Sequence, residues 1–154
     1  MDQSSLPPQV RDSLAGWHRY LQTNAAEDLD PLLSDDVVFR SPVAHRPYPG
    51  REAIKLVLTT VNQVFRNFRY FREFASDDGL NVVLEFGAEV DGKALKGVDV
   101  IRFDASGKIV EFEVMVRPAS GLQALGAAMT ARLASKTDIL FSASPSESTK
   151  GASR

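Results

Sequence analysis

Few side chains in this sequence could carry acid–base or nucleophilic chemistry. Its 154 residues include no cysteine and two histidines, so we expect no thiolate nucleophile, no disulfide framework and no thiolate metal site. Histidine is the side chain best suited to proton exchange at neutral pH, and His45 lies in a proline-rich stretch. His18 follows Trp17 on a predicted helix and points about 100° away from it, so we interpret it as a surface or interface residue.

The sequence contains no motif for a metal or an organic cofactor. The patterns HExxH and GxSxG and the glycine patterns that cradle phosphates are absent, and the carboxylates do not cluster with metal-binding spacing. We therefore expect no metal and no cofactor. The chain has 18 basic and 20 acidic residues and a net charge of −2, which gives no strong attraction to nucleic acid or to an anionic membrane.

One stretch, residues 65–74, interleaves arginine with aromatic residues, a pattern that can bind single-stranded nucleic acid by stacking. Because the chain is net acidic and acidic residues lie close by, we favour a helix end that passes into a strand, and we expect no nucleic-acid partner. No apolar run is long enough to cross a membrane, and the first residues lack the pattern of a signal peptide. We expect a cytoplasmic protein with no membrane contact.

Hydrophobic periodicity divides the chain into a helical part and a β-rich part. Helical spacing covers residues 8–24 and 54–65, with a short helix around Leu32 and a β segment at 37–39 between them. After Asn67 come four β-rich segments, 69–76, 80–90, 94–104 and 108–117, and the Asp91-Gly92 pair between two of them is a hairpin signal. Helical spacing returns after Pro118. Helices grouped before an antiparallel sheet indicate the α+β class.

We predict one domain over residues 1–134, followed by a serine-rich tail over 135–154. We interpret the chain from Ser142 onward as mobile, because its composition cannot bury enough apolar surface to offset the entropy of ordering. The alternative is that Ile139, Leu140 and Phe141 dock this segment on a partner.

Four short motifs carry a family resemblance. They are LSDDVVF at 33–39, PGREAI at 49–54, GVDVIRFD at 97–104 and GKIV at 107–110. In their order and spacing the chain resembles the nuclear transport factor 2-like superfamily, in its SnoaL-like and ketosteroid-isomerase-like branch. The resemblance implies a cone-shaped roll, in which a curved antiparallel sheet packs on three N-terminal helices and a C-terminal helix follows. It also implies a deep apolar pocket for a small apolar molecule, and a homodimer through the outer sheet face.

The resemblance also orients the strands. If Asp99 points inward, as its counterpart does in the isomerases, the alternation of side chains along each strand fixes the remaining directions. The outer face then carries Val83, Val98, Val100 and Met115 among charged residues. The pocket lining implied in this way is Trp17, Phe39, Ser41, Val43, Leu58, Leu84, Phe86, Ile101, Phe112, Val114 and Val116.

At the positions that the isomerases use for catalysis, this chain departs from the pattern. Ser41 stands where they have an aspartate base, Trp17 where they have a tyrosine donor, and Leu58 where they have a supporting tyrosine. A serine hydroxyl cannot act as a base near neutral pH, and an indole N–H can donate a hydrogen bond but cannot transfer a proton. We therefore do not expect the standard ketosteroid isomerase reaction.

Asp99 remains as the candidate catalytic group. Among apolar neighbours its pKa should rise, so that it could donate a hydrogen bond as a neutral acid or accept a proton as a base. His45, at the expected pocket mouth, would assist; the alternative is an exposed loop histidine. A further alternative for Asp99 is a buried acid that is satisfied by the Trp17 N–H or by a water and does no chemistry.

Two classes of function follow. The first is an enzyme that isomerises, cyclises or hydrates a small hydrophobic molecule, with Asp99 as its acid or base. The second is a non-catalytic module of the same fold, which binds an apolar ligand or pairs with a second copy through the outer sheet face.

Overall fold

Three helical segments precede the last four strands of the sheet in the computed structural model, which describes residues 1–141. After a short 3₁₀ helix at Gln3–Ser5, α1 spans Pro8–Thr23, a 3₁₀ helix spans Ala26–Leu32 and α2 spans Arg51–Val64. Asn24 ends α1 in the left-handed conformation, where its N–H bonds to the carbonyl of Tyr20. The second segment is 3₁₀ rather than α-helical and contains Pro31, which cannot donate a helical hydrogen bond.

The sheet has six strands. They are β1 Leu33–Arg40, β2 Tyr48–Pro49, β3 Arg66–Ala75, β4 Asn81–Val90, β5 Lys93–Phe103 and β6 Ile109–Arg117, in the spatial order β2-β1-β6-β5-β4-β3. The predicted meander of β3 to β6 is confirmed, and Asp91-Gly92 forms its tight turn with positive φ at both residues. The sheet is not wholly antiparallel, because β1 pairs with β6 in parallel.

The chain crosses from the sheet to its last helices at a cis peptide bond between Arg117 and Pro118. Helix α3 spans Ala119–Leu133, and after a 3₁₀ turn at Ala134–Lys136 a short helix, α4, spans Thr137–Phe141. Folded structure thus continues past the predicted boundary at residue 134. Leu140 is buried in the core of this same domain, whereas Ile139 is exposed. Residues 142–154, which include the predicted mobile segment, lie outside the described residues.

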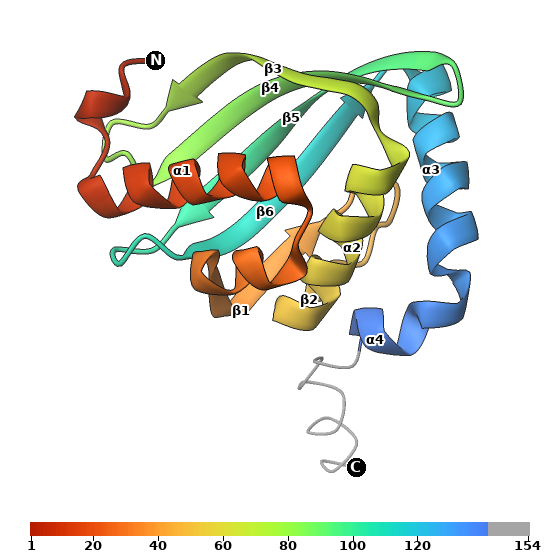
Figure 1. Ribbon diagram of the computed structural model, residues 1–154, viewed down its shortest axis with the longest axis horizontal. Helices are drawn as coiled ribbons and strands as arrows, with labels where there is room; N and C mark the ends of the chain where they lie inside the picture. Colours follow the sequence, from red (N-terminus) through yellow and green to blue (C-terminus); the bar gives the residue numbers. More distant parts are fainter. Residues whose placement is uncertain (142–154) are drawn as a thin grey trace.

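The curved sheet and the helices enclose the core (Figure 1). Helix α1 lies across one face of the sheet, α2 and α4 pack beside β1 and β2, and α3 runs past the ends of β4, β5 and β6. The largest fully buried side chains come from both layers and include Tyr20, Ile54, Phe86 and Phe112. None of the helices in residues 1–141 is long and apolar enough to cross a membrane.

Candidate functional site

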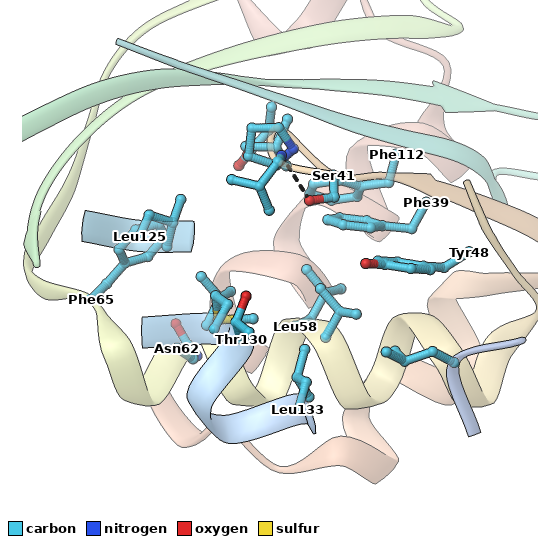
Figure 2. A pocket seen from close by; sticks show the side chains of 18 of the residues that line it. Phe39, Ser41, Tyr48, Leu58, Asn62, Phe65, Phe112, Leu125, Thr130 and Leu133 are labelled. Carbon is cyan, nitrogen blue, oxygen red and sulfur yellow. Dashed lines mark hydrogen bonds between the residues drawn. The ribbon is translucent and has the colours of Figure 1, made fainter. Parts of the chain in front are cut away.

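A cavity of about 270 Å³ lies inside the cone. The concave face of the sheet forms one side, through Phe39, Phe86, Asp99 and Phe112, and helices α1, α2, α3 and α4 form the others. Figure 2 shows Phe65, Leu58, Leu125 and Leu133 around the space, with Ser41 on the opposite side. Apolar and aromatic side chains make up most of this lining, which suits an apolar occupant.

Five aromatic rings form a continuous row along one wall. Trp17 and Phe112 have ring centroids 5.1 Å apart, and Phe112 lies 5.9 Å from Phe39. Phe39 and Tyr48 are nearly parallel at 6.3 Å, which Figure 2 shows clearly. Tyr48 meets Phe141 of α4 edge-on at 5.2 Å. The row therefore runs from α1, across β6, β1 and β2, to the last helix.

Asp99 is the one buried carboxylate that the described residues place on this cavity. Strand β5 holds it opposite Leu84 of β4 and Val114 of β6. Its Oδ2 accepts a 2.6 Å hydrogen bond from the Tyr70 hydroxyl. The Trp17 Nε1–H in turn donates to the Tyr70 oxygen at 2.9 Å. Trp17 therefore does not reach Asp99 directly, as the buried-acid alternative had it; Tyr70 lies between them.

Burial raises the pKa of Asp99 from 3.8 to about 7, although the hydrogen bond from Tyr70 opposes the rise. Only Oδ2 takes part in that bond, and no buried side-chain oxygen or nitrogen of residues 1–141 lacks a partner. Oδ1 is therefore the oxygen that the cavity reaches. A carboxyl with this pKa exists in both protonation states near neutral pH, so it can both donate and accept a proton.

Ser41, at the position of the isomerase base, has a structural task. Its Oγ accepts hydrogen bonds from the backbone N–H groups of Val43 at 3.1 Å and Ala44 at 3.3 Å. These bonds shape the loop 41–50 where it borders the cavity. The hydroxyl proton stays available for donation, while both lone pairs of the oxygen are engaged. Ser41 can thus offer a hydrogen bond to an occupant but cannot take up a proton.

The structure places eight of the eleven predicted lining residues on the cavity, namely Trp17, Phe39, Ser41, Val43, Leu58, Phe86, Phe112 and Val114. Leu84 and Ile101 face inward but are fully buried in the core beside the cavity. Val116 is half-buried and borders a shallow hollow of about 260 Å³ near the end of β6, away from the cavity. His45 is exposed on its loop and does not line the cavity.

Several lining residues were missed by the sequence prediction. Tyr20 shares a helical face with Trp17, a spacing that could have revealed it. Tyr48 belongs to the short strand β2, which lies inside the proline-rich stretch that holds His45. Helices α3 and α4 supply a whole side of the cavity, from Leu125 to Phe141. No local pattern says where a C-terminal helix packs, so this side was not predictable from periodicity.

The comparisons with known proteins agree with this fold. A SnoaL-like domain matches residues 14–112. A steroid delta-isomerase from Pseudomonas aeruginosa is 52% identical, and the match covers 84% of this chain and 95% of that one with a TM-score of 0.81. An uncharacterized protein with a cystatin-like fold from Silicibacter pomeroyi is 31% identical over 91% of this chain and 95% of that one, with a TM-score of 0.79. No curated protein gives a match.

Proposed function

Because this chain belongs to the SnoaL-like domain family, we propose that its cavity binds a small, largely apolar molecule through one polar contact with Asp99. The observation that carries the proposal is a buried carboxyl whose Oδ1 opens into a mostly aromatic and aliphatic space. A neutral Asp99 would donate a hydrogen bond to a carbonyl or ether oxygen of the occupant. We further propose that the carboxyl serves as acid or base in an isomerisation, cyclisation or hydration.

The name of the relative from Pseudomonas aeruginosa, steroid delta-isomerase, supports a reaction in which a proton moves between two carbons. In such a step the Asp99 carboxylate would take a proton from the carbon next to a ketone, and the resulting carboxyl would return it two carbons further along. One carboxyl can do both, so the missing base at Ser41 does not exclude the reaction class. Within residues 1–141 no second carboxylate lines the cavity, so we assign both proton transfers to Asp99.

Binding is tested with two neutral probes of nearly equal shape, 2-acetylnaphthalene and 2-isopropenylnaphthalene, which differ in a ketone oxygen. At pH 5.5 the neutral Asp99 should hold the ketone about tenfold more tightly than the hydrocarbon. At pH 8.5 this advantage should disappear, because the ionised carboxyl has no proton to donate. Asp99→Asn should bind the ketone equally at both pH values, since its amide N–H replaces the carboxyl proton. Equal affinities of the two probes at pH 5.5 would contradict the proposal.

Catalysis is tested with a bicyclic β,γ-unsaturated ketone, whose conversion to the conjugated isomer is followed by ultraviolet absorption. The enzyme hypothesis expects conversion by the native protein and its loss in Asp99→Asn, with a cooperative melting transition to show that the variant is folded. Binding of 2-acetylnaphthalene without any conversion supports the second class of function, a ligand-binding module. The enzyme hypothesis is supported by Asp99, because a buried acid with a pKa of about 7 suits proton transfer.

We also propose that the protein forms a homodimer through the outer sheet face. Met115 is 51% exposed there, beside a hollow lined by Val98, Gly97 and Lys96. An apolar side chain next to a hollow with both apolar and charged walls suits a two-fold interface, in which each copy fills the hollow of the other. Met115→Glu should convert the dimer into a monomer in light scattering, and Gln123→Glu, on the exposed face of α3, should leave it intact. A native protein that is monomeric at micromolar concentration would contradict the dimer.

A further inference from the structure

We propose that Tyr70 is a positioning residue, which holds Asp99 by one oxygen and so presents the other oxygen to the cavity, with Trp17 acting behind it. The proposal deepens the proposed function, since it concerns the carboxyl that would meet the ligand. It rests on the direction of the hydrogen bonds in the chain Trp17–Tyr70–Asp99.

The direction follows from what each group can do. An indole N–H can only donate, so the Tyr70 oxygen is the acceptor in the 2.9 Å contact with Trp17. The single hydroxyl proton of Tyr70 is then left for Asp99 Oδ2, 2.6 Å away. Oδ2 is thereby fixed as an acceptor. Any proton that Asp99 carries must reside on Oδ1, the oxygen that faces the cavity.

The backbone conformation of β3 directs the Tyr70 side chain towards Asp99. Tyr70 pairs with Phe86 of β4, and the register between the two strands shifts on both sides of it, between Arg66 and Arg69 and again between Tyr70 and Glu73. On each side β3 spans three residues against two on β4, as in a β-bulge, which redirects a side chain relative to its neighbours. Phe68 and His18 pack edge-on against the Tyr70 ring at 5.0 and 5.6 Å, which fixes its orientation.

The charged groups nearest to these three hydrogen-bonded residues are the partly exposed side chains of His18 and Glu73, beside Tyr70. His18 of α1 touches the Tyr70 ring, and its Nε2 is 3.9 Å from Glu73 Oε1 on β3. The neighbours of Asp99 on β4 and β6 are Leu84 and Val114, which do not titrate. Tyr70 itself has a pKa raised well above its ordinary value, by burial and then by the charge of Asp99. It therefore stays protonated and keeps donating when Asp99 ionises.

The test measures the pKa of Asp99 in the ligand-free protein, from the side-chain carboxyl carbon in ¹³C NMR, with Asp99→Asn to assign the signal. Tyr70→Phe removes the donor to the carboxylate and keeps the ring, so the pKa of Asp99 should rise by about one to two units. Trp17→Phe removes the indole N–H that donates to the Tyr70 oxygen and so makes the Tyr70 hydroxyl a weaker donor. This variant should raise the pKa of Asp99 by less than Tyr70→Phe does. Tyr20→Phe is the matched control: it removes a buried hydroxyl that bonds to Asn24, and it should leave the pKa of Asp99 unchanged.

A second measurement avoids any loss of packing. Replacing the 3 tyrosines by 3-fluorotyrosine makes each hydroxyl a stronger donor, and the pKa of Asp99 should fall. The proposal is overturned if Tyr70→Phe, folded by its melting curve, shifts this pKa no more than Tyr20→Phe does, or if fluorination leaves it unchanged. Because the ligand-free protein is measured, failure of the naphthalene probes to bind would count against the proposed function and not against Tyr70.

Discussion

The guanidinium of Arg46 lies 4.1 Å above the ring centroid of Phe141. This contact joins the loop that carries Ser41 to the last described turn of the chain. The ring of Tyr48 also packs edge-on against the ring of Phe141. Phe141 and Leu140 of α4 both line the cavity, so a helix of five residues closes a space that the sheet and the longer helices leave open.

Removal of Phe141 should open the cavity. In Phe141→Ala the row of aromatic rings ends at Tyr48 and Arg46 loses its stacking partner, so 2-acetylnaphthalene should dissociate several-fold faster in stopped-flow fluorescence. Ile139→Ala, a change of similar kind on the exposed side of the same helix, is the control. A dissociation rate that is the same in both variants would mean that α4 does not retain the occupant.

The stability of the protein should depend on pH through Asp99. Its pKa is about 7 in the folded protein against the ordinary aspartate value of 3.8, so the folded state keeps a proton that the unfolded state releases. The resulting contribution to the free energy of unfolding is present below about pH 4 and is lost as the pH rises towards 7, by up to about 4 kcal/mol. Asp99→Asn cannot titrate and should therefore gain stability relative to the native protein between pH 4.5 and pH 8.

Urea denaturation of both proteins at these two pH values measures the effect, and the difference between them cancels the other acids. Asp77→Asn, in an exposed turn, serves as the control and should follow the native protein. If the difference between Asp99→Asn and the native protein is the same at pH 4.5 and pH 8, Asp99 ionises in the folded protein as readily as in the unfolded chain.

Gly97 should not accept a side chain. A Cβ at this position would lie 2.5 Å from the Met115 carbonyl oxygen and 2.5 Å from the Phe86 ring. Gly97→Ala should therefore lower the free energy of unfolding by about 1–3 kcal/mol, because Phe86, a cavity-lining ring, has to move. Gly126→Ala adds the same methyl group in α3, 3.2 Å from Val43, and helix propensity favours it by up to about 1 kcal/mol. Thermal unfolding should separate the two variants clearly.

The order of the elements and the class of fold could be predicted because both depend on short-range sequence patterns. Turn residues such as Asp91 and Gly92 separate the strands of the meander, and helical spacing marks α1 and α2. The family resemblance, rather than any pattern around Asp99, indicated that this residue points inward. Strands β4, β5 and β6 pair regularly around Asp99. For this reason the alternation of side chains placed Phe86, Phe112 and Val114 correctly on the cavity.

The role of Tyr70 was not predictable in the same way. Two register shifts on β3 change which residues face inward. Simple alternation along the strand gives the wrong side-chain directions beyond such a shift, and no sequence signal marks the shifts. Tyr70 therefore stood among arginines and phenylalanines as one more aromatic residue of a strand. The parallel position of β1 beside β6 and the packing of α4 depend on contacts between distant segments, which local propensity does not encode.

The pairing of β1 with β6 also affects the order in which the strands of the sheet form during folding. Val38 lies opposite Glu111 and Phe39 opposite Phe112, so strands that are more than 70 residues apart in the sequence become neighbours. During synthesis, β1 leaves the ribosome long before its partner exists, and such distant pairings close slowly. We expect β1 to join the sheet late, after the meander of β3 to β6 has formed. Its apolar residues, such as Val37 and Phe39, stay exposed for that interval and are open to capture by a chaperone.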